Sequence, residues 1–195
     1  MADKIDVPNV MTPKFRVSFP NVFRPGKPVD PTKAGKYSVT MLFDKDANLE
    51  PLKKAMVDFM TKRFGCHQAA WPKLSRNPSR DQGEKTFEGY VAGAKFINAA
   101  SNTKPGLVDA QNNDIINEAD FYPGCYARAT VRPFWYDTAG NKGVAFGLQN
   151  IQKLADGEPL GGRVSASKEF EPVAPAGGGG SDTAKTAKTA ADLFG

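Results

Sequence analysis

The sequence predicts a mainly β domain with one long helix, in the α+β class, followed by a disordered C-terminal tail. Several stretches alternate apolar and polar residues with the two-residue period of a strand. One stretch instead repeats apolar residues every three or four positions, which is typical of a helix. From residue 172 the composition changes to Pro, Ala, Gly, Ser and Thr, which bury too little apolar area to fold. We expect a flexible arm at residues 1–11, a folded domain at residues 12–171 and the tail at residues 172–195.

The length and the net charge of the chain limit the classes of protein to which it can belong. The 195 residues, of which 40% are hydrophobic and 24% charged, suffice for one domain with a hydrophobic core. The net charge of +5 permits a nucleic-acid partner without requiring one. No apolar run approaches the roughly 18 residues needed to cross a bilayer, and the N-terminus lacks the apolar core of a secretory signal. We therefore expect a cytoplasmic protein with no membrane partner.

The sequence offers little catalytic or metal-binding chemistry. His67 is the single histidine, which removes most general-base chemistry. Cys66 and Cys125 form no Cys-x-x-Cys pair, so we expect neither a zinc site nor a disulfide framework. The acidic residues between 109 and 120 are candidates for a magnesium-dependent nuclease, but they lie in a turn-rich connection and are better explained as solvated loop acids. We expect no cofactor, no metal and no enzymatic activity.

The first two predicted strands share one pattern. In residues 14–19 the Phe and Val positions, Phe19 included, form an apolar face, and Arg16 belongs to the opposite, basic and polar face. In residues 36–43 the Tyr, Val, Met and Phe positions face the core, and Lys36 lies on the opposite face. The repetition of a basic and polar face in two strands favours a binding surface.

A helix is predicted from about Asp46 or Asn48 to Phe64 by its stripe of Leu, Met and Phe residues. The long polar connection that follows, residues 66–88, carries an aromatic side chain and several cations. A loop of this length is usually functional or disordered. A clamp on nucleic acid is one interpretation; the other is that Trp71 pins the loop to the core.

The next predicted strand, residues 90–98, contains Lys95 and Phe96, and a turn that carries Lys104 follows it. Later in the chain, the Gly- and Asn-containing segment 137–143 predicts a hairpin connection to a return strand at residues 143–154. These elements complete a mainly antiparallel arrangement.

The most informative stretch is residues 126–136. With a two-residue period, its outward face carries Arg128, Arg132, Phe134 and Tyr136, and its other face carries small apolar residues. Two guanidinium groups and two aromatic rings suit a polymer with a charged backbone and flat bases, which is single-stranded nucleic acid. The alternative is an amphipathic strand whose arginines face water and whose aromatics cap the core.

The order of these elements favours a small curled antiparallel sheet closed by one helix, an OB-fold-like barrel. A β-sandwich with an appended helix is the competing architecture. Both are compatible with the periodicity.

Four segments of the sequence resemble a known family. They are Lys104-Pro-Gly-Leu-Val-Asp109, Phe121-Tyr-Pro-Gly-Cys-Tyr126, Gly143-Val-Ala-Phe-Gly-Leu-Gln-Asn-Ile-Gln152 and Asp156-Gly-Glu-Pro-Leu-Gly-Gly162. On these segments the chain, from about residue 11 to residue 163, resembles the tailed-phage single-stranded DNA-binding proteins with an elaborated OB fold, typified by the protein of enterobacterial phage Enc34. The resemblance implies sequence-nonspecific binding of single-stranded DNA in phage replication, recombination or repair. It also implies a flexible tail that contacts phage or host replication and recombination proteins.

The candidate DNA-binding residues are cations for phosphates and aromatic rings for bases. A bulge at Pro133 would turn Trp135 outward, so Trp135 stays among them. The phosphate candidates are Arg16, Lys36, Lys95, Lys104, Arg128 and Arg132, and the stacking candidates are Phe96, Phe134, Trp135 and Tyr136. In the tail, Asp192, Leu193 and Phe194 are typical of a short docking peptide. A homodimer is compatible with this interpretation, and a non-enzymatic virion structural or assembly protein is the alternative function.

Overall fold

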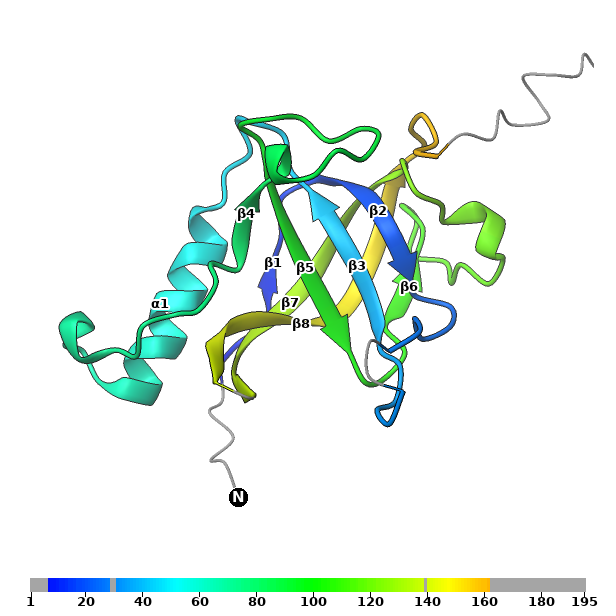
Figure 1. Cartoon of the computed structure of the whole chain (residues 1–195). Coiled ribbons are helices and arrows are strands. Elements are labelled where there is room, and N and C mark those ends of the chain that lie inside the picture. The colour runs from blue at the N-terminus through cyan, green and yellow to red at the C-terminus, as the bar shows by residue number, and fades with distance from the viewer. Residues whose placement is uncertain (1–6, 29–30, 139, 162–195) are drawn as a thin grey trace, which may run out of the picture. The chain divides into compact units, whose positions relative to one another are not determined.

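Five strands close into a β-barrel in the computed structural model, which describes residues 7–28, 31–138 and 140–161 (Figure 1). They are β2 (Phe15–Asn21), β3 (Tyr37–Leu42), β5 (Lys95–Ser101), β7 (Tyr126–Thr138) and β8 (Asn141–Ala155). The pairs β2–β3, β3–β5, β2–β7 and β7–β8 are antiparallel, and a parallel pairing of β5 with β8 closes the barrel. The predicted OB-fold-like barrel is confirmed.

Short elements decorate this barrel. The strand β1 (Val10–Met11) pairs with β7, β4 (Ser79–Asp81) pairs with β5, and β6 (Gly106–Val108) pairs with β8. The helix α1 (Glu50–Phe64) lies beside the barrel, next to β1 and β4 in Figure 1. Three short 3-10 turns lie in the connections: η1 (Gln68–Ala70), η2 (Gln82–Glu84) and η3 (Glu118–Asp120).

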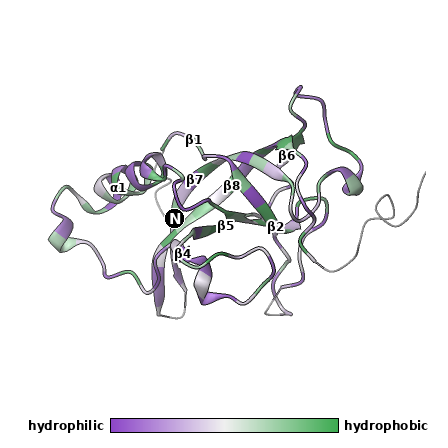
Figure 2. Ribbon diagram, turned by 90° about the horizontal axis from the view of Figure 1, so that it is seen from above, coloured by the Kyte–Doolittle hydropathy of each residue, from purple (hydrophilic) through white to green (hydrophobic). Residues whose placement is uncertain are grey.

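The core fills the barrel with the inward side chains of its strands. Phe15 and Phe43 meet edge to face at 5.9 Å between ring centroids, and the small residues Ala127 and Ala129 of β7 are buried beside them. A second apolar cluster under α1 includes Phe59. Figure 2 shows the hydrophobic residues concentrated on the barrel strands, whereas α1 is largely hydrophilic on its outer side. Burial of these side chains fixes which face of each strand remains outside.

The helix forms where its apolar stripe predicts it. Its Leu, Phe and Met residues face the barrel, and the side chain of Asn48 accepts a hydrogen bond from the backbone N–H of Glu50 at 3.0 Å. Pro51 lies in the first turn, where its missing N–H costs nothing. The helix ends at Phe64 and is capped by Gly65, whose φ of 88° is favourable for glycine. The predicted helix is confirmed.

Three expectations about the folded part need correction. The N-terminal arm is not loose throughout, because Val7 is buried and β1 pairs with β7; residues 1–6 lie outside the described residues. The strand expected from residue 90 begins at Lys95, and turns precede it. The hairpin connection is shorter than predicted, since β7 and β8 pair up to Thr138 and Asn141.

Phe19 lies on the opposite side from the one its sequence position predicts. Its φ of 45° and an extra residue in β2 between Ser18 and Asn21 interrupt the alternation of the strand. The ring therefore leaves the core side, and 53% of the residue is exposed.

Across the described ranges no helix is long and apolar enough to cross a bilayer. The predicted tail at residues 172–195, with Asp192, Leu193 and Phe194, lies outside the described residues. So does the boundary at residue 171.

Candidate nucleic-acid interface

The two faces of β7 follow the predicted alternation. Ala127, Ala129 and Val131 are buried in the barrel, whereas Arg128 and Phe134 are exposed on the outside. Small residues face inward because the barrel core leaves little room there, and the long side chains then have to face out. The strand thus presents its arginines and one aromatic ring on a single outer surface.

The structure contradicts the bulge predicted at Pro133. Pro133 pairs in register with Phe146, and the extra residues in the β7–β8 ladder occur in β8, opposite the steps after Tyr126 and after Thr130. The alternation therefore continues without reversal through Phe134, which keeps 40% of its surface exposed.

Trp135 consequently points away from this outer surface. Its ring meets Phe64 of α1 edge to face at 5.0 Å between centroids, and the guanidinium of Arg63 lies 6.0 Å from its ring. The tryptophan belongs to the apolar cluster under the helix. We remove it from the stacking candidates.

Tyr136 lies over a glycine of the neighbouring strand. It pairs with Gly143, and a Cβ atom at that glycine would lie 2.6 Å from the tyrosine hydroxyl oxygen. Glycine is therefore required for the ring to lie against the sheet. The half-buried ring keeps a restricted outer surface near the tip of the β7–β8 hairpin.

A row of small and polar side chains crosses the outside of the barrel next to β7. Ala99 and Phe146 form a pair inside the barrel, so their neighbours Ala100 and Gly147, which also pair, face outward. Strand register extends this row in both directions, to Ser38 on β3 and to Arg132 on β7. A second row pairs Thr40 with Asn98, whose side chains share a 2.8 Å hydrogen bond. We call Ser38, Thr40, Asn98, Ala100 and Gly147 the outer belt.

One end of the outer belt opens into a basic hollow. The β2–β3 connection forms this hollow, and Ser38 of the belt lies on its edge. Lys27, Lys33 and Lys36 line it. Lys36 precedes β3 directly, so the predicted phosphate candidate lies beside the belt. Lys104 lies at the same end of the barrel, three residues after Ser101, which pairs with Tyr37.

The arginines of β7 are held by neutral partners. The Nε of Arg132 donates to the Asn9 side chain at 3.0 Å, and the Nε of Arg128 donates to the Gln152 side chain at 2.8 Å. Amide oxygens orient a guanidinium without neutralising its charge, so both groups remain available to phosphates. Arg132 adjoins the belt through Gly147, whereas Arg128 lies further along the strand.

Two other predicted residues are engaged in the fold. The guanidinium of Arg16 donates to the backbone oxygens of Gly124 and Glu158, at 3.4 and 2.6 Å, and so anchors the segment that follows β8. Only 3% of Phe96 is exposed, and the guanidinium of Arg80 lies 5.1 Å from its ring centroid. A covered ring offers no face to a base, so Phe96 is removed from the stacking candidates, and Arg16 has a structural role.

Lys95 is paired with a carboxylate. Its Nζ lies 3.2 Å from Asp81, and hydrogen bonds from the Gly93 and Gly83 backbones and from Lys95 hold the pKa of that carboxyl below its usual range. Lys104 instead lies over the Phe23 ring at 5.8 Å from its centroid and keeps its charge exposed. Of these two lysines, Lys104 is the better phosphate candidate.

The long connection after α1 is pinned to the fold through its tryptophan. The indole N–H of Trp71 donates to the backbone oxygen of Gly65 at 2.8 Å, and its ring packs on the cluster under the helix. This supports the interpretation of Trp71 as an anchor rather than a clamp on nucleic acid.

The acidic connection stabilises its own turn. Asp109 accepts from the side chain and backbone of Asn113 and from the backbone of Gln111, and these hydrogen bonds lower the pKa of its carboxyl. Within the described residues no group of three His, Cys, Asp or Glu side chains is placed to hold a metal ion. Asp109 therefore serves as a turn residue, and Glu118 of the same connection pairs with Arg24 at 3.3 Å.

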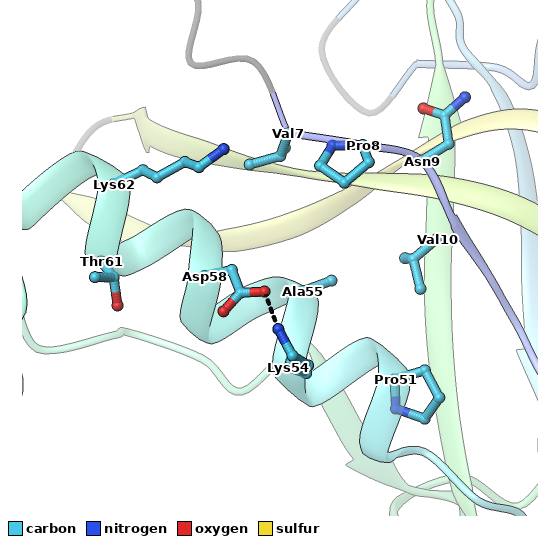
Figure 3. Close-up of a pocket in the computed structure, with 10 residues that line it drawn as sticks. All are labelled: Val7, Pro8, Asn9, Val10, Pro51, Lys54, Ala55, Asp58, Thr61 and Lys62. Carbon is cyan, nitrogen blue, oxygen red and sulfur yellow. Dashed lines mark hydrogen bonds and ion pairs between the residues drawn. The ribbon is translucent and has the colours of Figure 1, made fainter.

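A further hollow lies between residues 7–10 and α1, shown in Figure 3. Its lining includes Val7, Val10 and Ala55, and the ion pair of Lys54 with Asp58, at 2.6 Å, borders it. Of the predicted site residues that the structure describes, none lines it.

Solved structures place this barrel in a known class. It is similar to the single-stranded DNA-binding protein of bacteriophage Enc34 in complex with ssDNA, with a TM-score of 0.63 and 21% identity over 78% of this chain and 89% of that chain. It is also similar to gp2.5, a single-stranded DNA-binding protein encoded by bacteriophage T7, with a TM-score of 0.55 and 12% identity over 89% of this chain and 99% of that chain. The fold is thus that of the OB-fold-like phage barrels.

Sequence comparison then gives the family. The family model described as the Enterobacter phage Enc34 ssDNA-binding protein matches residues 8–179, and the chain belongs to this family. A relative, putative protein p50 of Acyrthosiphon pisum secondary endosymbiont phage 1, is 29% identical over 171 residues, which cover 83% of this chain and 91% of that protein.

Proposed function

We propose that this protein binds single-stranded DNA without sequence preference, has no enzymatic activity, and acts in phage DNA replication, recombination or repair. The observation that carries the proposal is the outer belt, which crosses the barrel between an exposed aromatic ring and a lysine-lined hollow. Family membership supports the same function.

The position of the belt agrees with the general use of this fold. OB barrels bind oligonucleotides on their second and third strands and with the loops that join strands one and two and strands four and five. Here those strands are β3 and β5, which carry most of the belt. The first loop contains Lys27 and Lys36, and the second is the tip of the β7–β8 hairpin, below which Phe134 and Tyr136 lie.

The chemistry of the surface explains binding without sequence preference. Small side chains such as Ala100 and Gly147 leave room for bases to approach the sheet, and Phe134 offers a ring on which a base can stack. Stacking contributes roughly 1–3 kcal/mol per base and tolerates every base. Lys36, Lys104 and Arg132 would contact the phosphates, which every sequence shares.

The proposal is tested by titrating labelled single-stranded and double-stranded oligonucleotides of mixed sequence at two salt concentrations, with fluorescence anisotropy as the readout. We expect tighter binding of the single strand and a linear fall of log affinity with log salt. A label on the DNA is preferable to tryptophan quenching, because Trp71 and Trp135 both pack away from the belt. Equal affinity for duplex would contradict the proposed preference for single strands. No salt-dependent binding together with self-assembly would favour the alternative of a virion structural protein.

A further inference from the structure

We propose that Phe19, Phe87 and Tyr90 form a second base-stacking platform, on the side of the outer belt away from Phe134. We call these three residues the aromatic platform. This inference rests on the proposed function, because it requires a single strand of DNA that lies along the belt. The bound DNA would then have two stacking sites. One is formed by β2 and the 85–94 connection, and the other lies on β7.

The platform is a continuous chain of aromatic contacts. Phe19 and Phe87 meet at 5.1 Å between ring centroids, and Phe87 and Tyr90 meet at 5.5 Å. Tyr90 in turn contacts the covered ring of Phe96 at 6.0 Å, so the chain is supported from below by the barrel wall. Its outer members remain open, with 53% of Phe19 and 49% of Phe87 exposed.

The backbone is strained where it exposes Phe19. A regular strand would send this ring inward with Phe15 and Val17, which are both buried. A φ of 45° places it outside instead, in a region that non-glycine residues rarely adopt. Strain of this kind costs stability and clusters at ligand-binding sites. Exposure of a large apolar ring adds a further cost. The conformation of Phe19 therefore lowers the stability of the fold in two ways.

Strand register connects the platform to the belt. Ser18, the neighbour of Phe19, pairs with Thr40, and Thr40 pairs with Asn98 of the belt. The Tyr90 hydroxyl lies 3.3 Å from the Ser18 hydroxyl, which fixes the ring beside this row. Across the barrel, a Cβ atom at Gly147 would lie 3.7 Å from the Phe134 ring. The belt is therefore bordered by aromatic rings on both sides.

The exposed rings of the platform, with a lysine beside them, favour a strand of DNA as its occupant. Lys85 is exposed two residues before Phe87, and it has no ion-pair partner among the described residues. Of the neighbouring carboxylates, Glu84 pairs with Arg80, whereas Glu88 accepts from the backbone of Gly161 at 3.1 Å and keeps its charge. The exposed rings can stack on bases, and the Lys85 ammonium can contact a phosphate between them. Because the rings adjoin the belt, one strand of DNA can reach both surfaces.

The test compares oligothymidylates of increasing length, from about 4 to about 16 nucleotides, the range of site sizes found for OB folds. The wild-type protein is expected to gain affinity steeply once the oligonucleotide is long enough to reach both stacking sites. Phe87→Ala should lose roughly tenfold in affinity for the long oligonucleotides, the equivalent of one stacked base, and little for the shortest ones. Phe87→Trp should retain the affinity and add a fluorescence signal that the long oligonucleotides quench.

Ile116→Ala is the matched control, because Ile116 is an apolar side chain exposed in a different connection, after β6. Phe19→Leu keeps an apolar contact with Phe87 and removes the aromatic face, so it should lower affinity for the long oligonucleotides, and thermal unfolding checks that it folds. If the wild-type protein binds single strands and Phe87→Ala, Phe19→Leu and Ile116→Ala all bind as it does, the platform is a structural cluster or a protein-docking surface. If the wild-type protein does not bind single strands, the proposed function itself is wrong.

Discussion

At the scale of single residues, the neighbours Phe134 and Trp135 show how register separates a binding residue from a packing residue. Phe134 is exposed beside the belt, whereas Trp135 packs on Phe64 under α1. We predict that Phe134→Ala lowers affinity for single-stranded DNA about tenfold, the loss of one stacked base, and leaves the melting temperature nearly unchanged. Trp135→Phe should do the reverse, with a lower melting temperature and nearly intact affinity. Anisotropy titrations and thermal unfolding of both variants check this, and an affinity loss in Trp135→Phe alone would contradict the assignment.

The two arginines of β7 are expected to act through phosphates. Their partners Asn9 and Gln152 carry no charge, so each guanidinium keeps its full attraction for the DNA backbone. We predict that Arg128→Ala and Arg132→Ala each reduce the slope of log affinity against log salt by about 0.7, the value for one phosphate contact on a single strand. The losses should be the same for oligonucleotides of different sequence. An unchanged slope in the double variant would show that DNA does not cross this face of β7.

A carboxylate at the end of β8 makes stability depend on pH. The hydrogen bonds from Lys153, at 2.7 Å, and from the Tyr122 hydroxyl, at 2.9 Å, hold the pKa of Asp156 below its usual range. A lowered pKa in the folded state means that the unfolded chain binds the proton more readily. The stabilisation is therefore present at neutral pH and is lost as the pH falls below about 4.

We accordingly predict that Asp156→Asn weakens the acid-induced loss of stability. Urea unfolding of the variant and the wild-type protein from pH 7 to pH 3 measures this. The residual pH dependence should remain, because Asp81 and Asp109 also have lowered pKa values. Identical pH profiles for the two proteins would show that Asp156 contributes nothing to stability.

At the scale of elements, the long strands and the helix could be predicted because each carries a period. The helix begins at Glu50 and ends at Phe64, close to the expected bounds, and the faces of β7 alternate as predicted. The strands β1, β4 and β6 could not be predicted, because two or three residues are too few to show a period. Phe19 departs from its predicted face for a different reason, because a local backbone angle overrides the alternation there.

Two glycines of β8 offer a matched test of the ribbon that it forms with β7. A Cβ at Gly147 would meet its nearest atom at 3.5 Å, an ordinary contact, whereas a Cβ at Gly143 would lie 2.6 Å from the Tyr136 hydroxyl. We predict that Gly147→Ala folds normally and that Gly147→Leu, which fills the belt, lowers single-stranded DNA affinity without lowering the melting temperature. Gly143→Ala should instead displace the Tyr136 ring, and the melting temperature should fall. Equal melting temperatures for Gly143→Ala and the wild-type protein would contradict this packing, and full affinity in Gly147→Leu would place the DNA elsewhere.

At the scale of the whole molecule, the candidate site is assembled by the closure of the barrel. The sequence indicates the outer face of β7, with Arg132 and Phe134, because one strand carries both residues. It does not indicate the belt, since Ser38, Ala100 and Gly147 come from three strands and become neighbours only through strand register. Single-strand patterns likewise do not reveal that other segments cover Arg16 and Phe96. A surface built from one strand is therefore predictable, whereas one built across strands requires the fold.

The last prediction concerns how the folded domain and the predicted tail divide their roles. Residues 172–195 contain two lysines and two aspartates, so their removal leaves the net charge of the protein unchanged. The proposed DNA contacts lie between Phe19 and Gly147, within the folded domain. We predict that truncation after residue 171 leaves single-stranded DNA affinity nearly intact and abolishes the capture of phage or host replication proteins from infected-cell extract, and that Leu193→Ala/Phe194→Ala reproduces the loss of capture. A large loss of DNA affinity on truncation would instead make the tail part of the DNA site, and unchanged capture would place the partner surface on the barrel.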